Sequence, residues 1–492
     1  MSAEARPAVA ATYVDRDLIV AVAVVALVTL IHVVAGARLP LSVDEAHYTL
    51  YGVHLDWSYY DHPPLVGWLQ WLVLRLGDSE LVLRTWALVG YVVISALVYR
   101  IARDAALEAR VPAGRAATIA VLLVAGMPAA HFMGIGFVPE VPLAIAALAL
   151  VLPVARLARE PARLQSWLAV GVLLGLAGLS KYTAVLLAIG LAIFMVWDRR
   201  SRWLAQPGAW LAVAIALLMV VPVLYWNERH GWASFEYQWG QVGRGDSKLG
   251  NAALFALAQI PLYSLIVTFA VWRPALAAHT TLARLLVSLG ITIVVLGVLA
   301  GGKLHWTYVG WLLVTPLVAC RLAAPAWSRV LRVAAVSSAA ASVLAVGTLL
   351  ALLVFRPIGR FPSTAPALSG LIGWDDAARR ASQLRTEVFP SDAAATLMVS
   401  NWTFASRLAW YARPVPVQLN DVARSQFDYW FGKPHGSAIL VQPADDDAAE
   451  PPKLAFPMHC RFLEELDTPP TPRPANRFRF YACTPSAPGE PL

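Results

Sequence analysis

Long apolar runs recur through the first 355 residues, and short polar segments separate them. About 20 apolar residues cross roughly 30 Å of hydrocarbon as a helix. The pattern therefore predicts a polytopic α-helical membrane protein. The candidate spans are Leu18–Gly36, Leu81–Ile101, Ala116–Ile135, Val138–Leu157, Trp210–Trp226, Ala252–Trp272, Leu285–Ala300, Trp306–Leu322 and Val333–Phe355.

One further apolar stretch, Trp167–Trp197, is too long for one span and short for two, and Ser180-Lys181-Tyr182 interrupts it. Loop charges decide between the alternatives. If the stretch is a hairpin of two short helices, the chain has eleven spans, with 17 basic residues on the N-terminal side and eight on the other. Because short cytoplasmic loops are rich in Arg and Lys, we expect about eleven transmembrane helices and a cytoplasmic N-terminus. No small-residue cleavage site follows the first run, so we expect a retained anchor.

The chain changes character after Phe355 and becomes polar and rich in proline. "DDAARRASQLRTEVF" has a helical pattern, whereas "AATLMVS" and "SAILVQP" resemble strands. We expect residues 1–355 to form a transmembrane catalytic domain whose first extracytoplasmic loop is 38–80. Residues 356–492 would form a small extracytoplasmic α/β domain. In that compartment two states are possible for Cys460 and Cys483, a disulfide between them or two free thiols.

Composition supports the membrane assignment, because 58% of residues are hydrophobic, 14% are charged and the mean hydropathy is +0.60. A net charge of +8 would suggest nucleic acid for a soluble chain, but here the basic residues are topology markers. No Walker A, dinucleotide-binding, H-E-x-x-H or C-x-x-C motif is present. An extracytoplasmic site has no nucleotide sugar, so an activated donor would arrive on a carrier within the membrane.

Carboxylates cluster where the spans meet the outer surface. Asp44 and Glu45 follow the first span, and Asp61-His62-Pro63-Pro64 follows in the same loop, where proline restricts the backbone. Glu140 lies between two spans, where a carboxylate is costly unless it faces a cavity or a partner. The alternatives are a solvated loop for Asp44 and Glu45, and a helix N-terminus for Glu140.

Lysine is rare in this chain, with five lysines against 34 arginines, yet Lys181 and Lys303 both fall in tight outer turns. Two ammonium groups at one depth could neutralise a lipid-linked phosphate, although lysines also snorkel at helix ends. His305 and Trp306 adjoin Lys303, and the loop "WNERHGWASFEYQWGQVGRG" contributes Trp226 and Asn227. Such rings stack on sugars, and anchoring at the membrane interface is the alternative.

Six motifs occur in order at matching topology: "DEAHY", "YYDHPPLVGW", "VPEVPL", "GLSKYTA", "PVLYWNERHGWASFEYQ" and "GGKLHWTY". With them the chain resembles the bacterial glycosyltransferases of the GT-C class, family 39/83, a group similar to aminoarabinose transferases of lipid A and protein O-mannosyltransferases. The resemblance covers nearly the whole chain. It implies an enzyme of the bacterial cytoplasmic membrane that moves a sugar, with inversion, from a polyprenyl-phosphate donor to a lipid, glycan or protein acceptor outside.

The resemblance also implies roles for individual residues. Asp44 would be the general base, and Glu45 would orient it or help to hold a cation. Whether Asp44, Glu45 and Glu140 bind a divalent cation is left undecided by the resemblance. Glu140 occupies a position where relatives often have Asp. The donor phosphate would be bound by Lys181, Lys303, His62 and His305. The substrate would be contacted by Tyr60, Asp61, Glu140, Tyr182, Trp226, Asn227 and Trp306.

Two other classes of protein compete with the enzyme. A transporter or flippase of lipid-linked sugars would also need many spans and charged cavity residues, but transporters often contain inverted repeats, and no corresponding halves are visible. A scaffold with an outer interaction domain would not need the acidic and basic residues of the outer face. Because these residues gather on one face only, we expect an enzyme. The motifs do not specify the sugar or the acceptor.

Overall fold

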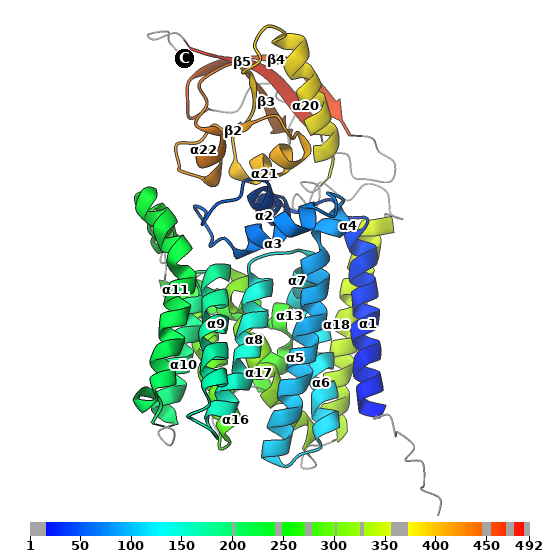
Figure 1. Ribbon diagram of the computed structural model, residues 1–492. Coiled ribbons are helices and arrows are strands. Elements are labelled where there is room, and N and C mark those ends of the chain that lie inside the picture. Colours follow the sequence, from blue (N-terminus) through cyan, green and yellow to red (C-terminus); the bar gives the residue numbers. More distant parts are fainter. Residues whose placement is uncertain are drawn as a thin grey trace, which may run out of the picture.

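The molecule has two layers, a bundle of apolar helices and a smaller domain with a β-sheet above one end of it (Figure 1). The computed structural model describes residues 16–198, 202–241, 248–270, 278–300, 303–324, 329–355, 372–444, 454–468 and 477–486. The N-terminal end of the first helix lies at the end of the bundle away from the sheet domain (Figure 1).

The bundle confirms the prediction of a polytopic helical membrane protein. In the described part of the chain six helices are long and apolar enough to cross a membrane, or seven if one bent pair counts as a span. The count of eleven stays a prediction. The bundle helices are α1 (Arg16–Gly36), α5 (Thr85–Ala109), α6 (Ala113–Ala125), α7 (Pro128–Ile135), α8 (Glu140–Leu157), α9 (Leu164–Ser180), α10 (Ala184–Trp197), α11 (Pro207–Arg229), α13 (Lys248–Tyr263), α14 (Leu265–Ala270), α16 (Thr281–Leu299), α17 (Tyr308–Ala323) and α18 (Arg329–Phe355).

Several of the predicted apolar stretches are divided between two helices. In Ala252–Trp272, α13 ends at Tyr263 and α14 begins at Leu265, and Ser264 between them has a positive φ. The stretch Trp167–Trp197 forms α9 and α10, which meet at Lys181, as the hairpin prediction requires. The predicted span Ala116–Ile135 is not one continuous helix, because α6 and α7 meet there at a bend of 74°. The break occurs at Met127, whose backbone is extended just before Pro128, and a residue before proline disfavours the helical region.

The segment between α1 and α5 contains three short helices, α2 (Val43–Val53), α3 (Leu65–Leu74) and α4 (Glu80–Leu83). A capping box starts α2: the Ser42 side chain accepts a hydrogen bond from the Glu45 amide, and the Glu45 carboxylate accepts one from the Ser42 amide. This reciprocal pairing satisfies two amide groups that an uncapped helix would leave without partners.

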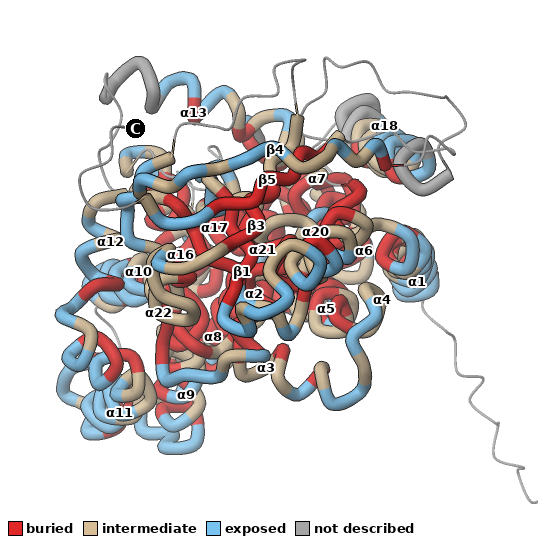
Figure 2. The backbone as a smooth tube through the Cα atoms, turned by 90° about the horizontal axis from the view of Figure 1, so that it is seen from above, coloured by how far each residue is buried: buried red, intermediate tan, exposed pale blue. Residues whose placement is uncertain are grey.

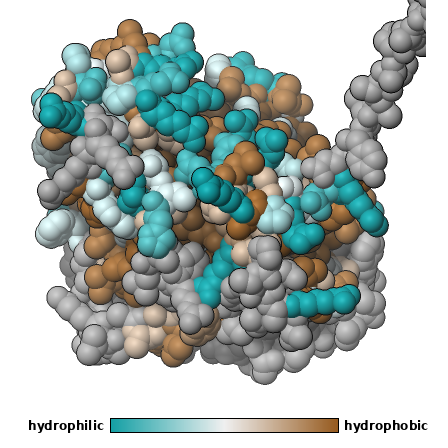
Figure 3. All heavy atoms as spheres, turned by 90° about the horizontal axis from the view of Figure 1, so that it is seen from below, coloured by the Kyte–Doolittle hydropathy of each residue, from teal (hydrophilic) through white to brown (hydrophobic). Residues whose placement is uncertain are grey.

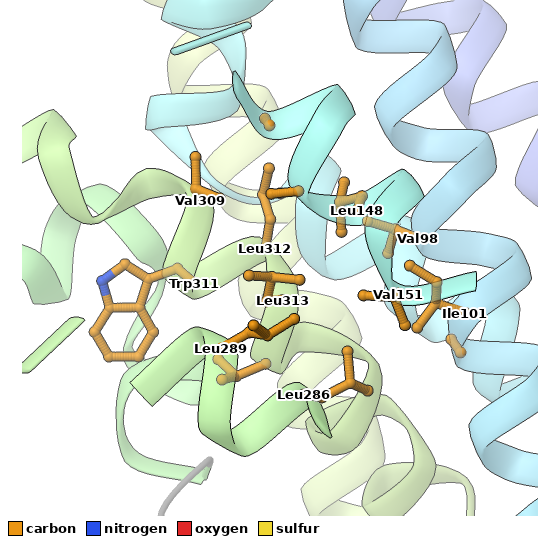
Figure 4. Packing of buried hydrophobic residues seen from close by; sticks show 14 of the residues in the cluster. Val98, Ile101, Leu148, Val151, Leu286, Leu289, Val309, Trp311, Leu312 and Leu313 are labelled. Carbon is orange, nitrogen blue, oxygen red and sulfur yellow. The ribbon is translucent and has the colours of Figure 1, made fainter. Parts of the chain in front are cut away.

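Helix α17 lies at the centre of the bundle. In its most apolar stretch, 89% of the residues are buried. Figure 4 shows Leu312 and Leu313 of α17 among side chains of α5, α8 and α16. Helices α1 and α11 lie at the periphery of the bundle. Only 22% and 17% of the residues in their most apolar stretches are buried. Their exposed apolar faces match a lipid environment, because hydrocarbon does not penalise them.

The sheet domain contains five strands in the order β2-β1-β3-β5-β4. Strand β1 pairs in parallel with β2 and β3, and β5 pairs antiparallel with both β3 and β4. The strands are β1 (Thr396–Val399), β2 (Val417–Leu419), β3 (Ala438–Pro443), β4 (Met458–Asp467) and β5 (Arg477–Pro485), and the helices are α20 (Trp374–Val388), α21 (Trp402–Tyr411) and α22 (Gln426–Phe431). The predicted helix and both predicted strands are confirmed. Cys460 and Cys483 are paired residues of β4 and β5 and form a disulfide.

The two layers share one hydrophobic cluster. It joins Leu41, Ala46 and Leu50 around α2 to residues of the sheet domain that include Trp374 and Phe427. Figure 2, seen from above, shows the buried strands β1 and β3 over the middle of the bundle. The opposite end of the bundle carries hydrophilic residues among hydrophobic ones (Figure 3).

Candidate active site

A cavity of about 260 Å³ lies between the bundle and the sheet domain. The bundle side contributes α2, the turn after Tyr59, the α9–α10 junction, helix α12 (Ala233–Gln241) and the short helix η3 (Leu304–Thr307). The sheet domain contributes Trp402 and residues between 419 and 427. Eight of the residues predicted for the site line this cavity: Asp44, Tyr60, Asp61, His62, Lys181, Lys303, His305 and Trp306.

Asp44 lies in the first turn of α2 and lines the cavity with a half-buried side chain. Among the described residues no hydrogen bond or ion pair reaches its carboxylate. A carboxylate without a partner in a cavity is available to accept a proton from a bound hydroxyl group, which is the requirement for a general base.

Glu45 does not face the cavity, although it is the next residue. Successive residues of a helix point about 100° apart, and the Glu45 carboxylate is buried against Arg84, whose Nε lies 2.6 Å from Oε1. Arg84 also donates hydrogen bonds to the carbonyl oxygens of Gly36, Leu39 and Pro40. Burial opposes ionisation of Glu45, but Arg84 outweighs it and lowers the pKa of the carboxyl group. The structure therefore gives Glu45 a role in joining α1, α2 and α5.

Asp61 accepts hydrogen bonds within a polar network that links both layers. The His47 ring nitrogen Nε2 lies 3.2 Å from Asp61 Oδ2, and the Tyr51 hydroxyl donates to Oδ1. The other His47 nitrogen, Nδ1, lies 3.3 Å from the Ser406 hydroxyl in α21. Burial disfavours the charged carboxylate, but His47, His62 and Tyr51 together lower the pKa of Asp61. Asp61 is thus an ionised carboxylate fixed in direction.

His62 lines the cavity next to Asp61, where Pro63 and Pro64 follow it. Burial lowers the pKa of His62 to about 4, and the charge of Asp61 only partly opposes this shift. Without a bound anion, His62 is neutral at pH 7. It can act there as a hydrogen-bond donor, but it brings no charge until an anion raises its pKa.

Lys181 and Glu140 form a buried ion pair in which each side chain is 4% exposed. His305 Nε2 also lies 3.2 Å from the same oxygen of Glu140. The ammonium group of Lys181 lies 5.6 Å from the centre of the Trp306 ring. Glu140 is the first residue of α8, and among the described residues its carboxylate contacts the side chains of Lys181 and His305, so these contacts account for its direction.

Lys303 is the second predicted lysine and lines the same cavity with an exposed side chain. Its ammonium group lies 5.9 Å from the centre of the Trp402 ring of α21. Within the described residues no carboxylate forms an ion pair with it. The cavity therefore contains one lysine neutralised by an internal carboxylate and one that is not.

Like Glu140, three other predicted substrate residues lie outside the cavity lining. The Trp226 indole donates a hydrogen bond of 2.8 Å to Asp56, and the buried Asn227 side chain accepts one from the Ser234 amide. Tyr182 packs edge-on against Phe235 of α12, with ring centres 5.5 Å apart. These contacts hold α11, α12 and the first loop together. The three residues therefore support the cavity wall and do not line the cavity.

The three carboxylates considered for a divalent cation are not brought together. Glu45 binds Arg84 and Glu140 binds Lys181, which leaves Asp44. Over the described ranges no group of three His, Cys, Asp or Glu side chains is arranged to hold a metal ion. These residues therefore do not fit such a cation.

Sequence reasoning missed the residues that the sheet domain and α12 bring to the cavity. They include Tyr237, Gln238, Trp402, Arg424 and Gln426, and His47 of α2 is a further lining residue that was not predicted. Gln238 donates a hydrogen bond of 2.7 Å to the Asp61 carbonyl oxygen, and the Gln426 side chain accepts one of 2.7 Å from the Tyr60 amide. Gln426 lies in the segment "SQFDYW", which begins at Ser425, and nothing in that segment alone predicts that it reaches Tyr60.

Comparisons with known proteins agree on the kind of fold. A family model described as dolichyl-phosphate-mannose-protein mannosyltransferase matches residues 61–226. The lipid A galacturonosyltransferase RgtD of Rhizobium johnstonii is 26% identical over 267 residues, which are 52% of this chain and 54% of that protein. The chain therefore spans about half the length of this curated relative.

Two solved structures are similar over nearly the whole chain. ArnT from Cupriavidus metallidurans bound to undecaprenyl phosphate has a TM-score of 0.66 at 17% identity, covering 96% of this chain and 99% of that one. Its apo state has a TM-score of 0.64 at 16% identity, covering 94% and 97%. The expected fold class is confirmed, because the chain has the GT-C fold of ArnT with a small C-terminal sheet domain.

Proposed function

We propose that this protein is an inverting glycosyltransferase that moves a sugar from a polyprenyl-phosphate donor to an acceptor at the outer membrane surface. One observation carries the proposal: the Asp44 carboxylate, which has no hydrogen bond or ion pair among the described residues, shares a cavity with the ammonium groups of Lys181 and Lys303. The comparisons support it, since the matching family model is named for mannosyl transfer, the relative RgtD for galacturonosyl transfer, and ArnT binds undecaprenyl phosphate.

The chemistry follows from these groups. The acceptor oxygen attacks the anomeric carbon from the face opposite the phosphate, and its proton passes to the Asp44 carboxylate. The bond between the anomeric carbon and the phosphate oxygen breaks, so polyprenyl phosphate leaves with the bonding electrons. Lys303, Lys181 and hydrogen bonds from His62 and His305 would stabilise the charge that develops on this leaving group. Asp61 and Tyr60 would position the sugar.

We also propose an orientation and a location. The site lies at the end of the bundle where α1 finishes, and the N-terminal end of α1 lies at the other end (Figure 1). Loops rich in arginine favour the cytoplasm, which supports a cytoplasmic N-terminus and an extracytoplasmic site in a bacterial cytoplasmic membrane. Residues 1–355 would be the transmembrane catalytic domain and 356–492 the outer domain, with a lipid, glycan or protein as acceptor.

The test compares two carboxylates of the same loop in purified protein reconstituted into nanodiscs. Polyprenyl-phosphate sugars are offered with extracted envelope lipids, glycans and proteins, and sugar transfer is followed by mass spectrometry. Asp44→Asn should lower turnover by a factor of about 10² to 10⁴, the usual contribution of a general base. Asp78→Asn is the control, because its side chain is 73% exposed and it does not line the cavity.

Two outcomes would overturn the proposal. Asp44→Asn with the turnover of the unaltered protein would exclude Asp44 as the base. Movement of intact donor across the membrane without release of sugar would indicate a transporter.

A further inference from the structure

The two lysines of the cavity differ in their electrostatic state. Lys181 is buried in contact with Glu140, whereas Lys303 is exposed, with its ammonium group 5.9 Å from the centre of the Trp402 ring and no ion pair to a carboxylate among the described residues. If both bind the donor phosphate, as the proposed function requires, only Lys303 does so without competition. A phosphate that approaches Lys181 has to share its ammonium group with a carboxylate that is already there.

Glu140 lies behind Lys181 and outside the cavity lining. Its Oε1 atom is the common partner of Lys181 and of His305, which lies 3.2 Å away. Lys181, His305 and Trp306 line the cavity, and Glu140 does not. Substrate in the cavity would therefore contact the nitrogen atoms of Lys181 and His305. The negative charge of Glu140 lies behind them, in contact with both.

That fixed charge affects the donor and the product differently. A polyprenyl-phosphate sugar is a phosphodiester with one negative charge, whereas the released polyprenyl phosphate is a monoester that approaches two negative charges at neutral pH. Like charges repel more strongly in a site shielded from water. The Glu140 carboxylate thus weakens binding of the product more than binding of the donor.

We infer that Glu140 is a resident counter-ion of Lys181 that limits retention of polyprenyl phosphate after transfer. This inference rests on the proposed function and deepens it. Glu140 is a positioning residue, because it acts through Lys181 and does not touch the substrate. While the site is empty it neutralises the buried ammonium group, which would be costly to leave unpaired. After transfer it competes with the phosphate monoester for that ammonium group.

The test measures binding and turnover in Glu140→Gln, which keeps the shape of the side chain and removes its charge. Undecaprenyl phosphate should bind to the variant at least tenfold more tightly than to the unaltered protein. The KM for the donor and kcat should both fall, because product leaves more slowly. Glu140→Asp keeps the charge and should stay within about threefold of the unaltered protein. Lys181→Gln should weaken binding of the same probe.

A second measurement needs no variant and so does not depend on Glu140→Gln folding correctly. In the unaltered protein undecaprenyl methyl phosphate, a diester with one charge, should bind at least as tightly as undecaprenyl phosphate. Preference for the monoester by tenfold or more would overturn the inference. Binding that weakens in folded Glu140→Gln as much as in Lys181→Gln would also overturn it, while leaving the proposed function intact. Absence of any undecaprenyl phosphate binding to the unaltered protein would instead contradict the proposed function.

Discussion

At the scale of single residues, the neighbouring carboxylates Asp44 and Glu45 have different tasks. Both lie in the first turn of α2, but the helix directs one into the cavity and the other against Arg84. The capping box and the Arg84 pair occupy both oxygens of Glu45. Chemistry at Asp44 therefore depends on a neighbour that fixes the start of α2.

This division predicts that removing the charge of Glu45 and removing that of Asp44 change the free energy of unfolding by different amounts. Glu45→Gln leaves the buried guanidinium of Arg84 without its counter-ion, and removal of one partner of a buried ion pair costs about 3–5 kcal/mol. Asp44→Asn removes a carboxylate without a partner among the described residues and should change the free energy of unfolding by less than about 1 kcal/mol. Thermal unfolding in detergent measures both. Equal losses of stability would contradict the assignment.

The state of His62 predicts how donor binding depends on pH. Burial lowers its pKa to about 4 in the free protein, and a bound phosphodiester would raise it by favouring the charged ring. Binding then takes up a proton, so affinity should increase as the pH falls from 7 to 5. Undecaprenyl methyl phosphate is a suitable probe because its charge is constant over this range.

The matched variant for this prediction is His62→Gln, which keeps a hydrogen-bond donor and does not titrate. Its affinity for the same probe should change with pH by at most half as much, in logarithmic units, as that of the unaltered protein. An unchanged pH profile in the variant would show that His62 does not contact the phosphate.

At the scale of elements, the close packing of α2 on α3 places Asp44. A Cβ atom at Gly52 would lie 2.8 Å from the Trp71 backbone nitrogen, and one at Gly67 would lie 2.7 Å from the Tyr59 hydroxyl oxygen. These glycines let the two short helices approach closely. Tyr59 also donates a hydrogen bond to the Tyr51 carbonyl oxygen, so the turn that carries Asp61 and His62 is packed on α2.

Gly52→Ala should therefore lower both stability and sugar transfer, since the added methyl group meets backbone atoms that cannot rotate away. Overpacking of this kind costs about 1–3 kcal/mol. Gly347→Ala is the control, because a Cβ atom there meets nothing within 4 Å, and alanine in a helix is neutral or stabilising by up to about 1 kcal/mol. Unfolding temperature and turnover of the two variants distinguish a packing effect from a general effect of alanine.

At the scale of the whole molecule, neither layer forms the cavity alone. The bundle supplies Asp44, His62, Lys181 and Lys303, and the sheet domain closes the cavity with Trp402 and the residues around Arg424. The shared hydrophobic cluster and the contact between the Tyr60 amide and Gln426 hold the domain in place. Because the disulfide of β4 and β5 stabilises that domain, the arrangement suits an oxidising compartment.

Much of the fold follows from sequence alone, because the properties involved are local. A run of apolar residues forms a helix in lipid wherever it occurs, as α1, α8 and α11 show. The polar segment after Phe355 similarly predicts a separate layer with a helix at 375–389. Breaks are harder to predict, since the 74° bend between α6 and α7 comes from one proline in a run that is apolar throughout.

The sequence by itself determined that this is a polytopic membrane protein with a polar C-terminal layer, and it singled out Asp44, Lys181 and Lys303 as unusual. Only the tertiary structure decided that Glu45 faces Arg84, that Glu140 neutralises Lys181 and that Ser406 reaches His47. The physical reason is distance along the chain. These partners are separated by 39, 41 and 359 residues, and hydrophobicity and charge within one segment carry no information about which distant segment packs against it.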